Sequence, residues 1–182
     1  MVGVQVRASD IYPSFINQSV SRNVGVGPFV PYMAAWTSHH RRAGSTPKIF
    51  FASDVPALEE WAVEAFPGVV FLYSGALRSN NPKLPTAFID PKLLGEDAAY
   101  KKGLDPLVIS LVLSKCDAIV SQESTIAELA FYFNPDLIHN AVNVQYTQAR
   151  VEPEWARGAT TLYSEDAWQG TPIPTPPYSA LA

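Results

Sequence analysis

The chain has 182 residues, a formal net charge of −4 and a hydrophobic content of 47%. This length allows one domain with a sizeable core, and this composition excludes a disordered chain. Its basic run at 39–42 is too short for non-specific nucleic-acid binding, and no apolar run approaches the roughly 20 residues of a membrane span. We therefore expect a globular domain with no nucleic-acid partner and no membrane-spanning segment.

The first half of the chain alternates strand and helix patterns. Strands are predicted at 1–7, 48–52 and 69–73, separated by a polar loop at 8–27 and a helix at 29–42. A second helix follows Ser53 or Asp54 as its cap, and its predicted buried face is Leu58, Trp61, Ala62, Ala65 and Phe66. Residues 74–100 show little periodicity and predict a long loop, which suits a lid, an insertion or an unrecognised element.

The second half contains the most informative stretch, residues 102–133. It predicts a helix, a short buried strand at 118–120, a polar turn and another helix, with a fifth strand near 141–144. For the two helices, the predicted buried faces are Leu104, Leu107, Val108, Leu111 and Val112, then Ile126, Leu129, Ala130 and Phe133. Thr125 and Glu128 have the spacing of a capping box, with Thr125 as the N-cap.

This alternation predicts an α/β fold of the Rossmann-like kind, with a mostly parallel sheet covered by helices on both faces. We expect one domain over 1–150 and an irregular, proline-rich tail over 151–182. Because the chain opens directly in a strand pattern, we also expect it to be part of a longer protein.

The polar turn from Ser121 to Thr125 is the first candidate site. It follows a strand and precedes a helix, which is where open α/β sheets bind phosphorylated ligands. The sequence therefore predicts a phosphate-bearing ligand there, with residues 1–7 as a second part of the site.

Three segments together resemble a known enzyme family. VGVQVRASD at 2–10, IFFASDVPALEEW at 49–61 and the stretch 102–134 are similar, in order and spacing, to the nucleotide-sugar half of GT-B fucosyltransferases. The relatives in question are the α1,6-fucosyltransferases, the nodulation fucosyltransferases and, more distantly, the protein O-fucosyltransferases. The resemblance covers about residues 1–135.

The resemblance implies a set of site residues. Arg7 matches the arginine that holds the donor pyrophosphate, and its forked guanidinium suits the departing nucleoside diphosphate. Asp10 matches an acidic partner, so Arg7 and Asp10 are the expected catalytic residues. The expected donor-binding residues, besides Arg7, are Gln5, Asp105, Ser121, Ser124 and Thr125.

Several residues depart from the family pattern. Gln5 replaces a histidine, Ala8 replaces a second basic residue, and Ile109 stands where many members carry an aspartate that helps to read guanine. The half of a GT-B enzyme that normally carries much of the acceptor site has no counterpart in these residues. Positions that grip phosphate are therefore kept better than those that read the base or move a proton.

Structural roles explain the same residues without a ligand. Arg7 fits a surface ion pair with Asp10 or Asp54, Asp10 fits a residue that orients Arg7, and Asp105 fits a helix cap. Ser124 and Thr125 are favoured helix caps in any case. Trp155 fits either stacking on a sugar or holding the tail in place.

By resemblance, the expected function is donor binding in a glycosyltransferase. The ligand would be a nucleotide sugar, GDP-fucose above all, for inverting transfer without a metal or other cofactor to a glycan or glycoprotein acceptor. An acceptor domain would precede this one, and the location would be the Golgi or endoplasmic reticulum in a eukaryote or the cytoplasm in a bacterium. The alternatives are a non-catalytic nucleotide- or glycan-binding scaffold derived from such an enzyme, and an unrelated flavodoxin-like or nucleotide-binding α/β domain.

Overall fold

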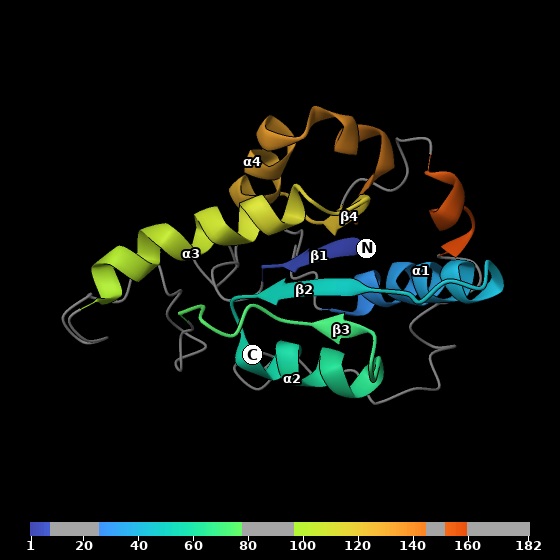
Figure 1. Cartoon of the computed structure of the whole chain (residues 1–182), viewed down its shortest axis with the longest axis horizontal. Helices are drawn as coiled ribbons and strands as arrows, with labels where there is room; N and C mark the ends of the chain where they lie inside the picture. The colour runs from blue at the N-terminus through green and yellow to red at the C-terminus, as the bar shows by residue number, and fades with distance from the viewer. Residues whose placement is uncertain (8–25, 78–96, 145–151, 160–182) are drawn as a thin grey trace, which may run out of the picture.

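A parallel sheet between two layers of helices forms the centre of the fold (Figure 1). The computed structural model describes residues 1–7, 26–77, 97–144 and 152–159. In this part of the chain, five strands pair in the order β3-β2-β1-β4-β5, all parallel. The strands are β1 (Val2–Val6), β2 (Ile49–Ser53), β3 (Val70–Phe71), β4 (Ala118–Ser121) and β5 (Ala141–Asn143). The strands follow the classic Rossmann order 3-2-1-4-5 and not the flavodoxin-like order 2-1-3-4-5, and the predicted α/β class is confirmed.

Four α-helices and three short 3₁₀ helices accompany these strands in the described residues, and the last 3₁₀ helix follows β5. The α-helices are α1 (Val30–Arg42), α2 (Pro56–Ala65), α3 (Ala98–Leu113) and α4 (Thr125–Phe133). The 3₁₀ helices are η1 (Gly27–Phe29), η4 (Pro135–Asn140) and η5 (Glu154–Ala156). No helix among the described residues is long and apolar enough to cross a bilayer.

Alternation along the strands divides the core in two. Val2, Val4 and Val6 of β1 belong to one buried cluster together with side chains of α1 and α2. On the opposite face, α3 and α4 pack against Phe50, Ala52 and Ile119, which form a second cluster. Because successive positions of a strand face opposite sides of the sheet, the position of Gly3 and the side chain of Gln5 face α3. Helices therefore cover both faces of the sheet, as expected.

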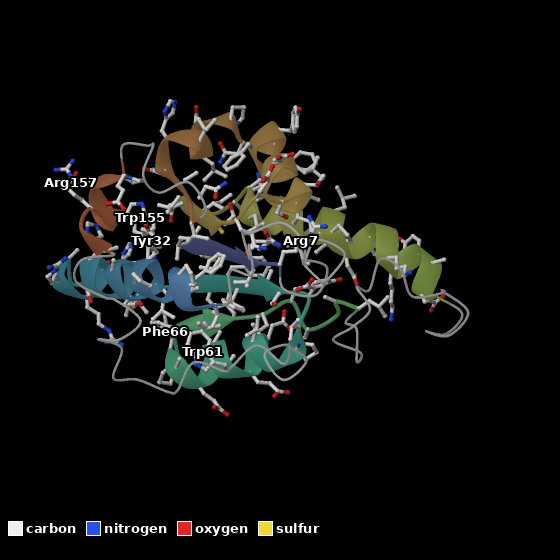
Figure 2. All side chains as sticks on the ribbon, turned by 180° about the vertical axis from the view of Figure 1, so that it is seen from behind. Arg7, Tyr32, Trp61, Phe66, Trp155 and Arg157 are labelled. Atoms are coloured by element: carbon white, nitrogen blue, oxygen red, sulfur yellow. The ribbon has the colours of Figure 1, made fainter. Side chains whose placement is uncertain are left out.

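The segment 152–159, far along the chain, packs against α1. Trp155 of η5 packs edge-on against Trp36 at 5.2 Å and Tyr32 at 6.5 Å between ring centroids. The Glu152 carboxylate accepts hydrogen bonds from the Tyr32 hydroxyl and from the Gly158 amide, both at 3.2 Å. Figure 2 shows Trp155 and Tyr32 together at one end of the molecule, well away from Arg7. Trp155 therefore holds this segment on α1, while the rest of the predicted tail, 160–182, lies outside the described residues.

The predicted buried face of α3 is wrong. Leu107 and Leu111 are each 40% exposed, whereas Asp105, Ile109 and Leu113 are buried. Apolar residues occupy so many positions of this helix that the hydrophobic pattern of the sequence does not define a single buried face. Packing in the folded protein buries the row of residues 105, 109 and 113 instead. The helix also begins at Ala98, inside the predicted loop at 74–100, of which residues 78–96 lie outside the described part.

The predicted face of α4 is corrected in a similar way. Ala127 and Ala130 are its buried residues, and Phe133 is 47% exposed. Small side chains let α4 lie close to α3, where the Ser110 hydroxyl donates to the carbonyl oxygen of Ile126 at 2.9 Å. Of the predicted face, Ala130 is therefore buried as expected and Ile126 packs partly buried against the core, while Phe133 lies outside.

Two predicted helix caps also differ from the structure. Val55 is the N-cap of α2, without a side-chain bond, while Ser53 ends β2 and its hydroxyl accepts from the Val55 amide at 3.2 Å. At α4 the N-cap is Ser124, one residue before the predicted Thr125. Ala127 then occupies the third helical position, so α4 has no capping box.

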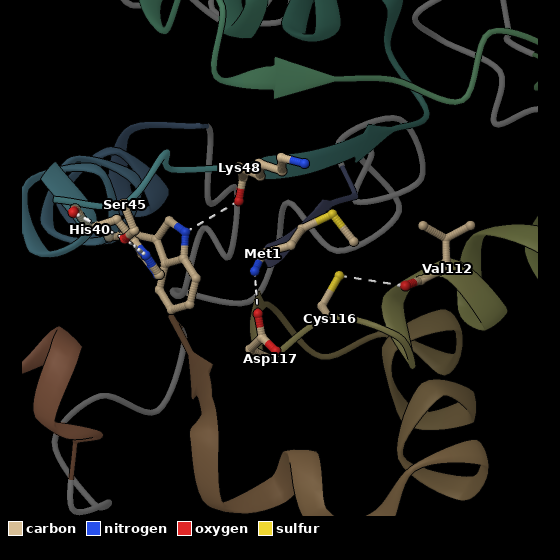
Figure 3. A network of polar contacts seen from close by, with 8 residues as sticks. Met1, His40, Ser45, Lys48, Val112, Cys116 and Asp117 are labelled. Carbon is tan, nitrogen blue, oxygen red and sulfur yellow. Dashed lines mark hydrogen bonds and ion pairs between the residues drawn. The ribbon is translucent and has the colours of Figure 1, made fainter. Parts of the chain in front are cut away.

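The amino ends of β1 and β4 are joined at the edge of the sheet opposite the candidate site (Figure 3). The Met1 amino group forms an ion pair with Asp117, the residue before β4. Cys116 is buried beside it, and its thiol donates to the Val112 carbonyl oxygen at 3.5 Å. Trp36 donates its ring N–H to the Lys48 carbonyl oxygen at 3.2 Å. These contacts stabilise the fold at a distance from the predicted ligand site.

Candidate functional site

The candidate site lies at the carboxyl edge of the sheet, between β1 and β4. These two strands are neighbours, yet the chain leaves β1 toward β2 on one side and reaches β4 only after β3, so the strand order reverses between them. Ligands of open α/β sheets bind at such a switch point. Arg7 directly follows β1, and the turn before α4 directly follows β4, so both belong to this edge.

Arg7 and the turn are connected by a side chain that sequence reasoning did not select. The Gln122 side chain donates from its Nε2 to the Arg7 carbonyl oxygen. Gln122 is 1% exposed, while Arg7 itself is exposed. The signal that could have found Gln122 is its place one residue beyond a buried strand, but the sequence does not tell which strand lies beside β4.

The amino terminus of α4 supplies hydrogen-bond donors. By helix geometry, the amides of Thr125, Ile126 and Ala127 have no acceptor within the helix. The Ser124 hydroxyl accepts from the Ile126 amide at 3.3 Å, and the Ser124 carbonyl oxygen accepts the first helical bond, from Glu128, at 2.9 Å. The positive end of the helix dipole is located here, so the arrangement favours an anion.

Gln5 and Ser121 lie beside each other below this edge. They are register partners in the β1–β4 pair, and both are buried, with Gln5 4% exposed. Ser121 ends β4 instead of opening the turn, and its carbonyl oxygen accepts from the Val144 amide at 2.9 Å. The Oε1 atom of Gln5 accepts no hydrogen bond from the described residues. These two residues therefore lie buried directly below the candidate site.

Asp105 is not a helix cap. It lies in the middle of α3, 5% exposed, and one carboxylate oxygen accepts from the backbone amide of Leu77, beyond β3. The other oxygen has no partner among the described residues. Figure 1 shows that the amino-terminal part of α3 projects beyond the carboxyl ends of β1 and β2. Asp105 therefore holds the segment after β3 close to α3.

The structure thus brings some of the predicted residues together and leaves others apart. Arg7, Ser121, Ser124 and Thr125 belong to the same edge of two adjacent strands, and Gln5 lies one layer below. Asp105 instead accepts a hydrogen bond from the Leu77 amide, in the segment that follows β3. Asp10 and Ala8 lie outside the described residues, so an Asp10 contact with Arg7 stays a prediction. No cluster of three metal-ligating side chains occurs within the described ranges.

Comparisons with known proteins add no relative. The chain matches no family model, and no curated protein and no solved structure matches it.

Proposed function

We propose that this chain is the donor-binding domain of a glycosyltransferase. It binds a nucleoside diphosphate sugar, with GDP-fucose the donor expected from the motifs, for inverting transfer to a glycan or glycoprotein acceptor. The observation that carries the proposal is the tie between Arg7 and Gln122, which joins the guanidinium-bearing end of β1 to the turn that opens α4. A cation and a helix amino terminus at one sheet edge suit a diphosphate.

The proposed chemistry is electrostatic. A nucleoside diphosphate gains negative charge as the bond to the sugar breaks, and a guanidinium and oriented amides stabilise that charge without a metal. Arg7 would hold the phosphate oxygens from the side of β1, and the amides of Thr125 and Ala127 from the side of α4. The proton acceptor for the attacking hydroxyl is not assigned to a residue of this chain.

Calorimetric titration tests the proposal directly. Wild-type protein should bind GDP and GDP-fucose but not guanosine, because the diphosphate makes the main contacts. A hydrogen bond to a charged group contributes about 1.5–3 kcal/mol, so Arg7→Ala should weaken binding by roughly 10- to 100-fold. Arg41→Ala is the matched control, because Arg41 is an exposed arginine in the last turn of α1.

The control variant should bind as the wild type does. Absence of diphosphate binding by the wild type, or equal binding by Arg7→Ala, would contradict the proposal.

A second function, a non-catalytic nucleotide-binding scaffold, is favoured by α3. Ile109 is buried against the sheet, and Asp105 already accepts a bond from the Leu77 amide. Helix α3 therefore presents few polar groups that could read a nucleobase at the candidate donor site. The two functions differ in turnover: an assay of sugar release from several nucleotide-sugar donors should show steady hydrolysis or transfer for an enzyme and none for a scaffold.

A further inference from the structure

Gln122 occupies the point where the ladder between β1 and β4 ends. The last register pair of these strands is Gln5 with Ser121, while β1 continues its pairing with β2 to Val6 and Ser53. Beyond Ser121, no backbone pairing links β4 to β1 in the described residues. The side-chain amide of Gln122 then bonds the Arg7 carbonyl oxygen and so extends the link between the strands.

The orientation of this amide is fixed by its partner. A backbone carbonyl can only accept, so the Gln122 nitrogen must face Arg7 and the oxygen must face away. That oxygen, Oε1, accepts no hydrogen bond from the described residues. Because Gln122 is only 1% exposed, bulk water does not satisfy this oxygen either. A buried acceptor without a partner lowers stability, so packing alone does not account for an amide at this position.

From these contacts we infer that Gln122 is a positioning residue for Arg7. By holding the Arg7 carbonyl at the end of β1, it fixes the backbone that carries the guanidinium at the same sheet edge as the amino terminus of α4. The ligand affinity of the site then depends on Gln122 through Arg7, without any contact between Gln122 and ligand. This inference rests on the proposed function, because it assigns a role within the same diphosphate site.

The substitution that tests the inference is Gln122→Met, which keeps the length of the side chain and removes the amide. The matched control is Asn134→Leu: the Asn134 amide also donates to a backbone carbonyl oxygen, that of Ser114 at 2.9 Å, but at the far end of α4. Each variant loses one hydrogen bond from a side-chain amide to a backbone carbonyl. A general loss of stability should therefore be similar in both, and only an effect specific to Arg7 distinguishes Gln122→Met from Asn134→Leu.

The first readout needs no ligand. The order parameter of the Arg7 Nε–Hε bond, measured by ¹⁵N relaxation at pH 6, should fall in Gln122→Met and stay at the wild-type value in Asn134→Leu. An unchanged order parameter in Gln122→Met would overturn the inference. In the wild type, the Gln122 side-chain amide protons should exchange with solvent more slowly than those of exposed amides. Exchange at the exposed rate would overturn the inference even if the variant does not fold.

The second readout is affinity for inorganic pyrophosphate in a double-mutant cycle. Gln122→Met should raise the Kd by about 3- to 10-fold in the wild-type background and by less than about 2-fold in an Arg7→Ala background, because its effect passes through Arg7. Equal factors in both backgrounds would show a general structural role and overturn the inference.

The two claims fail separately. No binding of pyrophosphate or GDP by the wild type would remove the proposed function. Binding that is lost in Arg7→Ala but kept in Gln122→Met would remove only the role of Gln122.

Discussion

Gly3 of β1 lies against the carboxyl-terminal end of α3, where a side chain would meet buried atoms. A Cβ atom added at Gly3 would lie 2.5 Å from Leu113 Cδ2 and 3.1 Å from Cys116 Sγ. Leu113 is fully buried, so it has little room to move. The absence of a side chain at Gly3 is therefore what lets the helix lie against the strand.

Substitution of Gly3 by alanine tests this contact. Overpacking of a filled core costs about 1–3 kcal/mol, so Gly3→Ala should lower the free energy of unfolding by that amount in urea titrations. Gly103 is the matched control, because it is an exposed glycine inside α3 with open space around its Cβ position. Gly103→Ala should raise the free energy of unfolding by about 0.5–1 kcal/mol. Equal effects at the two positions would contradict the packing account.

Cys116 gives the fold a predictable pH dependence. Burial raises the pKa of its thiol from the ordinary value of 9.0 to about 12. In the unfolded chain the thiol ionises near pH 9, whereas in the folded protein it stays protonated, so its contribution to stability is complete below pH 9 and is lost as the pH rises toward 12.

The comparison with Cys116→Ser isolates this effect. Between pH 9 and 12, the free energy of unfolding of the wild type should fall relative to the variant by up to about 1.4 kcal/mol per pH unit. Tyr32, whose pKa burial and the Glu152 carboxylate also raise, is present in both proteins and cancels in the difference. A difference that stays constant across this range would contradict the buried, protonated thiol.

At the scale of elements, α4 determines the character of the candidate site. Its N-cap is Ser124, whose hydroxyl accepts from the Ile126 amide, and Thr125 is the first helical residue. Loss of an N-cap hydroxyl costs about 1 kcal/mol. Ser124→Ala should therefore lower the free energy of unfolding by about that amount in urea, and Thr125→Ala by less than 0.5 kcal/mol, roughly the size of an exposed substitution. The opposite ranking would place the cap at Thr125.

Element boundaries were predictable where the sequence punctuates them. Gly44, with a φ of 70°, follows the end of α1 at Arg42 as predicted, and the helix begins at Val30, one residue after the predicted start. The buried face of α2 was also predictable, since Leu58, Trp61, Ala62 and Phe66 are buried and Ala65 packs against them. The buried faces of α3 and α4 were not fully predictable. In α3, the buried residues include Asp105 and Ser110, which no hydrophobic period would choose. Packing between α3 and α4 decides those faces, and that packing depends on contacts far apart in the sequence.

At the scale of the whole molecule, strand order brings separate motifs to one edge of the sheet. The sequence predicted the parallel sheet and both ends of the site, Arg7 and the turn before α4. It did not predict Gln122, because only the adjacency of β1 and β4 shows that a residue 115 positions away reaches the Arg7 carbonyl. The chain order of the strands does not reveal their order in space.

The central claim is that Arg7 and the amino terminus of α4 bind one diphosphate. NMR titration of ¹⁵N-labelled protein with GDP tests it most directly, because both groups carry observable N–H signals. The claim predicts that the Arg7 Nε–Hε signal and the backbone amides of Thr125 and Ala127 shift together, with a single Kd, and that Arg7→Ala weakens the shifts of both amides. Shifts confined to one of the two groups, or shifts that fit two different Kd values, would contradict it.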